Sequence, residues 1–264
     1  FTINKGLKVG YIAQENALDE DKTIWDEMLT VFDNLIEKNK RITKMQEQIA
    51  EHPEDEDLLQ RYDQLAYDFE QEGGFTYQAE IKSILNGFNF KENTWQKVIG
   101  TLSGGEKTRL AFVKLLLQKP PVLLLDEPTN YLDLDTLDWL EAFLKNYQGA
   151  IITVSHDQYF LDHLANQIFE LNFGKLTTFK GNYSQYVKER ELMNNQQEAA
   201  YEKQQEKIKK EEEFIQKNLV RASTTKRAQS RRKALDKMER IKPPKHKQKV
   251  RINFTSDRPS GKEV

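Results

Sequence analysis

The sequence predicts an α/β fold in which helices cover a parallel β-sheet. Two short apolar runs, at residues 122–126 and 150–154, have the length and composition of buried strands. Helical patterns at residues 105–118 and 135–145 precede them, so that helices and strands alternate along this part of the chain. Such alternation indicates a parallel sheet with helices packed on it.

The segment before this core is predicted to be helical. Residues 1–14 suggest the end of a β-hairpin, with a turn at Lys5-Gly6 and a strand-like apolar set after it. From Thr23 the apolar residues recur at helical spacing, until His52-Pro53 interrupts the pattern. A second helix then extends to Gly73-Gly74, so the two helices form a projecting hairpin, and a third helix covers about residues 77–85.

The segment after the core is predicted to be a hairpin of strands and then a hairpin of helices. Residues 168–171 and 176–179 form the two strands. No proline occurs between residues 183 and 241, and apolar residues follow at seven-residue intervals, which indicates a long helix, a break near residues 223–225 and a returning helix. Residues 250–254 alternate like the first strand of a further element.

Composition excludes several classes of protein. The chain has no cysteine, which excludes disulfides and thiolate metal sites, and no apolar run approaches the ~20 residues of a membrane-spanning helix. We therefore expect a cytoplasmic protein with no membrane partner.

Charge is distributed unevenly along the chain. Residues 188–264 hold 22 Lys and Arg against 12 Asp and Glu, whereas the earlier residues hold 18 Lys and Arg against 30 Asp and Glu. The basic half is either a polyanion-binding surface or a solvated helix face.

The first candidate site is a glycine turn at the start of a helix. It consists of Leu102, Ser103, Gly104, Gly105 and Glu106. Two glycines allow a phosphate to approach the backbone, the serine hydroxyl can donate a hydrogen bond, and the helix N-terminus supplies free N–H groups. The alternative is an ordinary capped helix.

The second and third candidates follow the two predicted strands. Asp126 and Glu127 end the first strand, where one carboxylate can hold magnesium and the other can polarise an attacking water. His156 follows the second strand and could contact a phosphate, because parallel sheets bind ligands beyond the carboxyl ends of their strands. The alternatives are a solvated acidic turn and a structural histidine.

These three features, in this order within residues 102–156, resemble the ATP-binding cassette (ABC) family. The resemblance implies a partial P-loop-type cassette that uses ATP and Mg²⁺. Residues 102–106 match the signature sequence, residues 122–126 match the Walker B strand, and residues 130–133, ending in Asp133, match the D-loop. His156 matches the switch histidine, and Gln14 matches the glutamine that reaches magnesium and the attacking water.

Within that family the chain resembles the ABC-F group, although Tyr131 stands where the group usually has histidine. The inserted arm, the run Gly181-Asn182-Tyr183 and the charged helical linker support this assignment. The resemblance implies two cassettes in one polypeptide, joined by a helical hairpin that contacts ribosome-bound tRNA. The expected segments are a cassette remnant (1–22), a helical arm and subdomain (23–100), the cassette core (101–187), a linker (188–247) and the start of a second cassette (248–264).

The linker contains a stretch of unopposed positive charge. Residues 215–234 contain no acidic and no aromatic side chain, which favours contact with an RNA backbone over base stacking. The predicted RNA-contacting residues are Lys217, Arg221, Lys226, Arg227, Arg231, Arg232 and Lys233.

No G-x-x-x-x-G-K-[ST] phosphate loop occurs in the sequence. We therefore expect the chain to be a fragment that neither binds ATP tightly nor hydrolyses it alone. Its signature turn would serve a nucleotide held by the opposite cassette. Two other functions stay open: the ATPase subunit of an ABC membrane transporter, and a non-hydrolytic RNA-binding adaptor.

Overall fold

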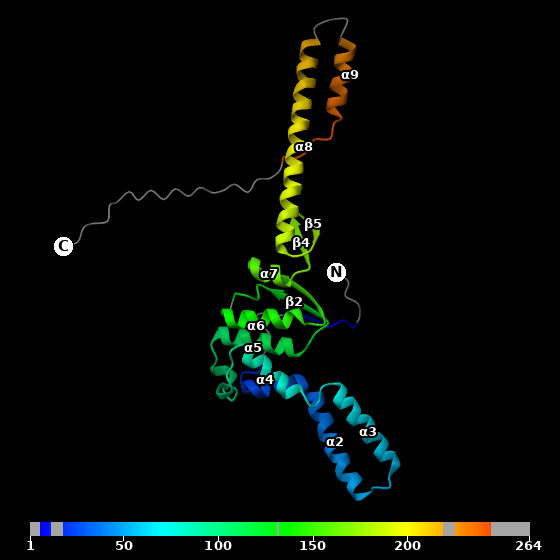
Figure 1. Ribbon diagram of the computed structural model, residues 1–264, viewed down its shortest axis with the longest axis vertical. Helices are drawn as coiled ribbons and strands as arrows, with labels where there is room; N and C mark the ends of the chain where they lie inside the picture. The colour runs from blue at the N-terminus through cyan, green and yellow to red at the C-terminus, as the bar shows by residue number, and fades with distance from the viewer. Residues whose placement is uncertain (1–5, 12–17, 131, 219–224, 244–264) are drawn as a thin grey trace, which may run out of the picture. The chain divides into compact units, whose positions relative to one another are not determined.

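The computed structural model describes residues 6–11, 18–130, 132–218 and 225–243 (Figure 1). The chain divides into two compact units between Gln167 and Ile168. Gln14, Tyr131, Arg221 and the strand expected at residues 250–254 lie outside the described residues.

The first unit is built on a parallel sheet of three strands in the order β1-β2-β3. The strands are β1 (Val9–Tyr11), β2 (Val122–Asp126) and β3 (Ala150–Val154). Tyr11, Leu124 and Ile152 lie opposite one another across the sheet. The predicted parallel sheet and the bounds of β2 and β3 are confirmed.

Helices cover one face of this sheet. Leu123 and Leu125 point to that face and are buried with apolar side chains of the helices. Those helices are α4 (Tyr77–Gly87), α5 (Gly104–Leu117), α6 (Leu134–Lys145) and α7 (Gln158–Leu164). Helix α7 was not predicted from the sequence, because seven residues are too few to establish a helical period. Asp157 begins this helix by accepting hydrogen bonds from the backbone N–H groups of Tyr159 and Phe160.

The other face of the sheet is exposed among the described residues. Ile152 and Val154 of β3 are 54% and 59% exposed, so the expectation that this strand is buried was wrong. Apolar composition predicted the strand correctly but could not show that only one of its faces packs against helices. Val9 and Tyr11 of β1 are exposed on the same face.

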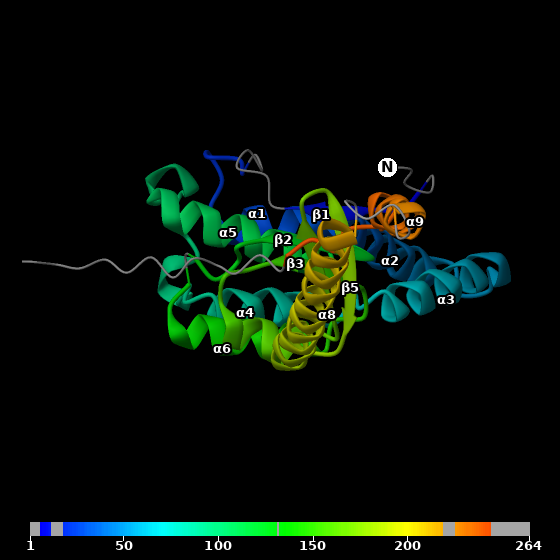
Figure 2. The same ribbon diagram turned by 90° about the horizontal axis from the view of Figure 1, so that it is seen from above.

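The insertion between β1 and α5 begins with α1 (Ile24–Leu29), a short 3-10 helix η1 (Thr30–Phe32) and the long helix α2 (Asp33–Glu51). The chain reverses at His52-Pro53 and continues as α3 (Glu56–Gln71), which lies beside α2 in both views (Figures 1 and 2). Leu35, Ile42 and Phe69 form the buried seam between the two helices. Two further 3-10 turns, η2 (Glu92–Thr94) and η3 (Ile99–Thr101), lead into α5. The predicted helical hairpin is confirmed.

The second unit contains the hairpin of β4 (Gln167–Asn172) and β5 (Lys175–Lys180), followed by α8 (Tyr183–Asn218) and α9 (Thr225–Asp236). Phe173 and Gly174 make the turn with positive φ angles of 47° and 74°. Ile208, Ile215 and Leu235 are buried between α8 and α9, which confirms the predicted long helix and returning helix.

Candidate functional site

The pairing of β2 with β3 brings Glu127 and His156 together. The backbone N–H of Glu127 donates to the carbonyl of Val154, 2.8 Å away, which extends the ladder by one bond beyond the strand. The backbone N–H of His156 donates to Oε2 of Glu127 at 3.1 Å, and His156 Nε2 lies 3.5 Å from Oε1 of the same carboxylate. The expected juxtaposition of these two side chains is therefore present.

Glu127 has an unusual backbone conformation. Its φ angle is 46°, in the left-handed region, which costs a non-glycine residue about 1–3 kcal/mol. Its side chain is only 21% exposed, whereas that of His156 is 98% exposed. The carboxylate is thus held in place at the strand end, while the imidazole remains accessible to a ligand.

Asp126 lies at the same edge of the sheet and is exposed. No described residue forms a hydrogen bond or ion pair with its carboxylate. Mg²⁺ in nucleotide sites is usually held by one or two carboxylates together with phosphates and water, so this single available carboxylate fits such an ion. In the described part of the chain, no group of three or more His, Asp or Glu side chains could hold a metal by itself.

The glycine turn begins α5 with a reciprocal cap. The backbone N–H of Ser103 donates to Oε2 of Glu106 at 2.8 Å, and the backbone N–H of Glu106 donates to the Ser103 hydroxyl at 3.4 Å. The side-chain hydrogen bond from Ser103 lowers the pKa of Glu106. A side-chain carbon added at Gly104 or Gly105 would meet no atom within 4 Å apart from the neighbouring residues and the backbone of the same helix, so the turn is open to an approaching group. Leu102, by contrast, is buried.

Asp133 has a capping role at the start of α6. Its carboxylate accepts from the backbone N–H of Thr136 at 2.9 Å and from the side-chain amide of Asn89 at 3.0 Å. These hydrogen bonds, that from Thr136 above all, lower the pKa of Asp133. Asn89 was not predicted from the sequence. It follows α4 with a positive φ angle of 63°, and its side chain reaches Asp133 at the start of α6.

The site residues therefore form two groups. Asp126, Glu127 and His156 lie at the carboxyl edge of the sheet, whereas residues 102–106 lie at the start of α5. No hydrogen bond or ion pair joins the two groups in the described part of the chain.

The positive charge of the helical hairpin is partly neutralised. Arg231 donates two hydrogen bonds to the carboxylate of Glu211, at 3.1 and 3.2 Å, and its guanidinium lies 4.1 Å from the ring centre of Phe214. Unopposed charge was thus the wrong expectation for Arg231, because α8 supplies an acid and a ring just outside the acid-free stretch. Other predicted RNA-contacting side chains are exposed, namely Lys217, Lys226, Arg227, Arg232 and Lys233.

Comparison with known families defines the class of protein. Two family profiles, both described as ABC transporter, match residues 4–130 and 169–254. Together they include the Walker B strand, the signature turn and the helical hairpin. The chain is an ATP-binding cassette protein. None of the helices in its described part combines the length and hydropathy that crossing a bilayer requires.

Individual relatives identify the group within the ATP-binding cassette family. YdiF of Bacillus subtilis is 44% identical to this chain over 263 residues, which are 98% of the chain and 41% of that protein. ABC transporter F family member 5 of Arabidopsis thaliana is 34% identical over 98% of the chain and 38% of that protein. The energy-dependent translational throttle protein EttA of Haemophilus influenzae is 34% identical over 81% of the chain and 38% of that protein. The chain belongs to the ABC-F family, and it spans about two fifths of the length of these relatives.

Proposed function

We propose that the protein containing this chain hydrolyses ATP, with magnesium, at interfaces between two cassettes, and that it acts on the ribosome. The observation that carries the first part is the contact between Glu127 and His156 at the carboxyl ends of neighbouring parallel strands. Ligands of open parallel sheets bind beyond those strand ends.

Each residue at this edge has a proposed role. Glu127 polarises the attacking water, and His156 contacts the terminal phosphate. Asp126 and Gln14 hold the magnesium ion, which supplies positive charge to the phosphates when bound. The held carboxylate of Glu127 and the exposed imidazole of His156 support this division, because a general base needs a fixed position and a phosphate ligand needs access.

The signature turn completes the site of the opposite cassette. Leu102 anchors the turn, Ser103, Gly104 and Gly105 face the nucleotide, and Glu106 and Asp133 fix the ends of their helices. The open space around both glycines, which begin α5, supports this role. The absence of any bond between this turn and Glu127 within the described residues agrees with service to a different nucleotide.

The direct test of the catalytic role is Glu127→Gln in the twin-cassette protein. Turnover of ATP should fall by about 100-fold or more, because the amide cannot accept the proton of the attacking water. Glu92→Gln, at an exposed acid outside the three motifs, is the matched control and should leave turnover unchanged. Unchanged turnover in Glu127→Gln would exclude the proposed role.

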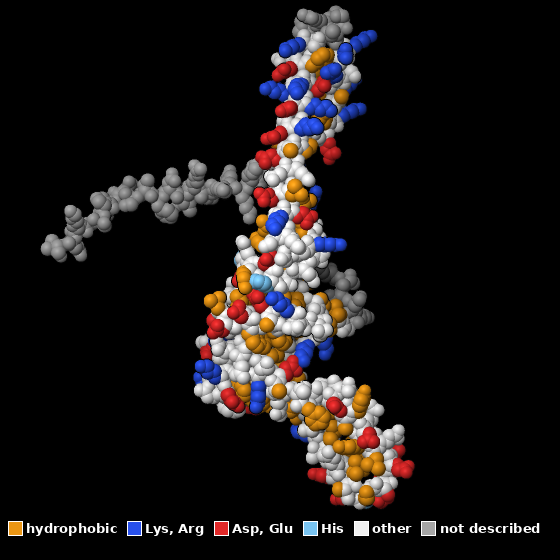
Figure 3. Space-filling view, in the orientation of Figure 1, with side chains coloured by type: hydrophobic (Ala, Val, Ile, Leu, Met, Phe, Trp, Pro, Cys, Tyr) orange, Lys and Arg blue, Asp and Glu red, His pale blue; other side chains and the backbone are white. Residues whose placement is uncertain are grey.

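The ribosomal role rests on the helical hairpin. Exposed Lys and Arg side chains lie over α8 and α9, with Asp and Glu side chains among them (Figure 3), and exposed basic side chains of this kind bind phosphates without reading sequence. The name of the relative EttA connects that protein with translation. We therefore assign ribosome-bound tRNA as the partner of the linker (188–247) and a cytoplasmic location to the protein.

The two alternative functions, a transporter ATPase and an RNA-binding adaptor, predict different partners and activities. A transporter ATPase would co-purify with membranes, whereas the proposed factor should co-purify with ribosomes. A non-hydrolytic adaptor would bind RNA in a salt-dependent manner while the twin-cassette protein shows no turnover.

The division into five segments, with a second cassette beginning at residues 248–264, is part of the proposed function. The 264 residues alone contain no G-x-x-x-x-G-K-[ST] loop, and we expect no turnover from them.

A further inference from the structure

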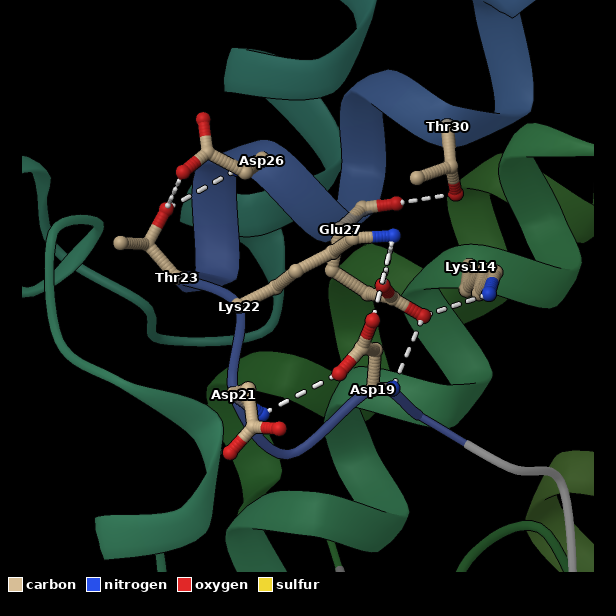
Figure 4. A network of polar contacts seen from close by, with 8 residues as sticks. All are labelled: Asp19, Asp21, Lys22, Thr23, Asp26, Glu27, Thr30 and Lys114. Atoms are coloured by element: carbon tan, nitrogen blue, oxygen red, sulfur yellow. Dashed lines mark hydrogen bonds and ion pairs between the residues drawn. The ribbon is translucent and has the colours of Figure 1, made fainter.

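Glu27 is a buried acid in the helical insertion. It lies on α1 between the buried residues Ile24 and Met28 and is only 1% exposed. Its Oε1 forms an ion pair with Nζ of Lys114 on α5 at 2.6 Å (Figure 4). A buried carboxylate that loses its partner is strongly destabilising, so this pair fixes α1 against α5.

The same carboxylate organises the segment before α1. The backbone N–H of Asp19 donates to Glu27 Oε1 at 3.4 Å, and Lys22 Nζ lies 3.9 Å from Glu27 Oε2. Lys22 also pairs with Asp19 at 3.3 Å, so residues 19–22 close into a compact turn around Glu27, as Figure 4 shows.

The turn at residues 19–22 also contacts the segment that leads into the signature sequence. The backbone N–H groups of Ile99 and Gly100 donate to the carbonyls of Lys22 and Glu20 at 3.0 and 2.9 Å. Glu20 also pairs with Lys107 at 2.7 Å, one turn after Ser103. Residues 19–22 therefore contact both the segment that enters the signature turn and the helix that leaves it.

We propose that Glu27 is a positioning residue for the signature turn, acting through Lys114 and through residues 19–22. This inference rests on the proposed function of residues 102–106. Glu27 fixes the orientation of α5 relative to residues 19–22. Ser103, Gly104 and Gly105 are therefore held in one geometry.

The test is hydrogen exchange of this chain with Glu27→Gln, which keeps the shape of the side chain and removes its charge. The hydrogen-bonded amides of Lys22, Gly100 and Lys107 should exchange about tenfold faster. The sheet amides of residues 122–126 should change less than about twofold. Glu20→Gln is the matched control, because it removes an exposed pair between the same segments and should have an effect below about threefold.

Variants of Lys114 complete the test. Lys114→Gln should reproduce the pattern. The double variant Glu27→Gln, Lys114→Gln leaves no buried carboxylate without its partner, and it decides the matter if a single variant does not fold. Lys114→Arg keeps the charge and should keep the exchange rates of the unchanged chain. Equal acceleration at the sheet, or no acceleration near the signature turn, would overturn the proposal. Exchange requires neither ATP nor a second cassette, so its outcome is independent of the turnover measured with Glu127→Gln.

Discussion

The left-handed backbone of Glu127 has a consequence for stability. A residue with a side chain is strained at a φ of 46°, whereas glycine adopts this conformation freely. The strain persists because the bond to the Val154 carbonyl and the bond from the His156 N–H hold the residue at the strand end. Strain of this kind is typical of functional sites, where position is maintained at the expense of stability.

Glu127→Gly should therefore stabilise the chain by up to about 1 kcal/mol while it removes the proposed base. Glu127→Gln retains the strain and should unfold at nearly the temperature of the unchanged chain. Thermal unfolding of both variants measures the difference. A glycine variant that unfolds at a lower temperature than the glutamine variant would show that the backbone is not strained here.

A second residue makes stability depend on pH. Glu141 on α6 is 7% exposed, and burial raises its pKa, although His163 on α7 lies 3.7 Å away and opposes the shift together with Lys145. Asp138 and Asp157 also raise the pKa of Glu141. The folded chain thus holds this proton more tightly than the unfolded chain, so the carboxyl group favours folding at low pH and loses that contribution as pH rises through the raised pKa.

Glu141→Gln removes this titration. The stability of the variant minus that of the unchanged chain should therefore be larger at pH 7 than at pH 4. Denaturant unfolding at both values measures the difference. Asp135→Asn, an exposed acid on the same helix that does not shift the pKa of Glu141, is the control for a general effect of removing an acid. A difference that is larger at pH 4 would contradict the assignment of burial as the dominant cause.

At the scale of elements, α8 is the longest feature. Its 36 residues correspond to a length of about 54 Å. At its base, Phe179 of β5 meets Tyr186 edge to face and Glu170 of β4 pairs with Arg190 at 3.1 Å. Near its far end, Arg231 joins α9 to Glu211 and Phe214. The helix is thus fixed to the strand hairpin at one end and to α9 at the other.

Arg231 and its neighbour Arg232 should behave differently when each is replaced by glutamine. Arg231→Gln should destabilise the α8–α9 hairpin by about 0.5–1 kcal/mol, since a half-exposed ion pair and a cation–π contact are lost. Arg232→Gln should leave the hairpin intact and lower the salt dependence of RNA binding by about one ion. Hydrogen exchange of α9 and filter binding to tRNA over a series of salt concentrations separate the two effects. Equal behaviour of the two variants would contradict the assigned roles.

The elements that sequence predicted well are those with a strong period or a clear stop. The bounds of β2 and β3 match because proline, glycine and acidic turns flank their apolar runs, and the arm reverses where His52-Pro53 interrupts the period. The short helix α7 was missed for lack of a period. The exposed face of β3 was missed because composition does not show which side of a strand has a neighbour.

Some contacts of the candidate site could be predicted from the sequence and others could not. Glu127 and His156 could be predicted to meet, since both follow strands of one parallel sheet. The contacts of Glu27 with Lys114 and of Arg231 with Glu211 join residues distant in sequence, and single-sequence patterns do not encode such pairs. Their roles therefore became visible only in three dimensions.

At the scale of the whole molecule, the proposed function couples ATP hydrolysis to contact with RNA. In the proposed function, residues of the first unit serve ATP hydrolysis between two cassettes, and the basic hairpin of the second unit contacts RNA. The acidic first part and basic last part of the chain agree with this division, because repulsion keeps the acidic part from the RNA backbone. Closure of two cassettes around ATP would change their relative orientation and so alter how the linker contacts tRNA.

The most direct test of this account is sedimentation of the twin-cassette Glu127→Gln protein with ribosomes. With ATP, the variant should remain closed and co-sediment with ribosomes, whereas without ATP, or with Glu127 unchanged, most of the protein should stay in the supernatant. Ribosome binding that is the same with and without ATP, or absent in both, would contradict the central claim. That claim is that closure of the two cassettes around ATP, at the site of Glu127 and His156, controls contact with the ribosome.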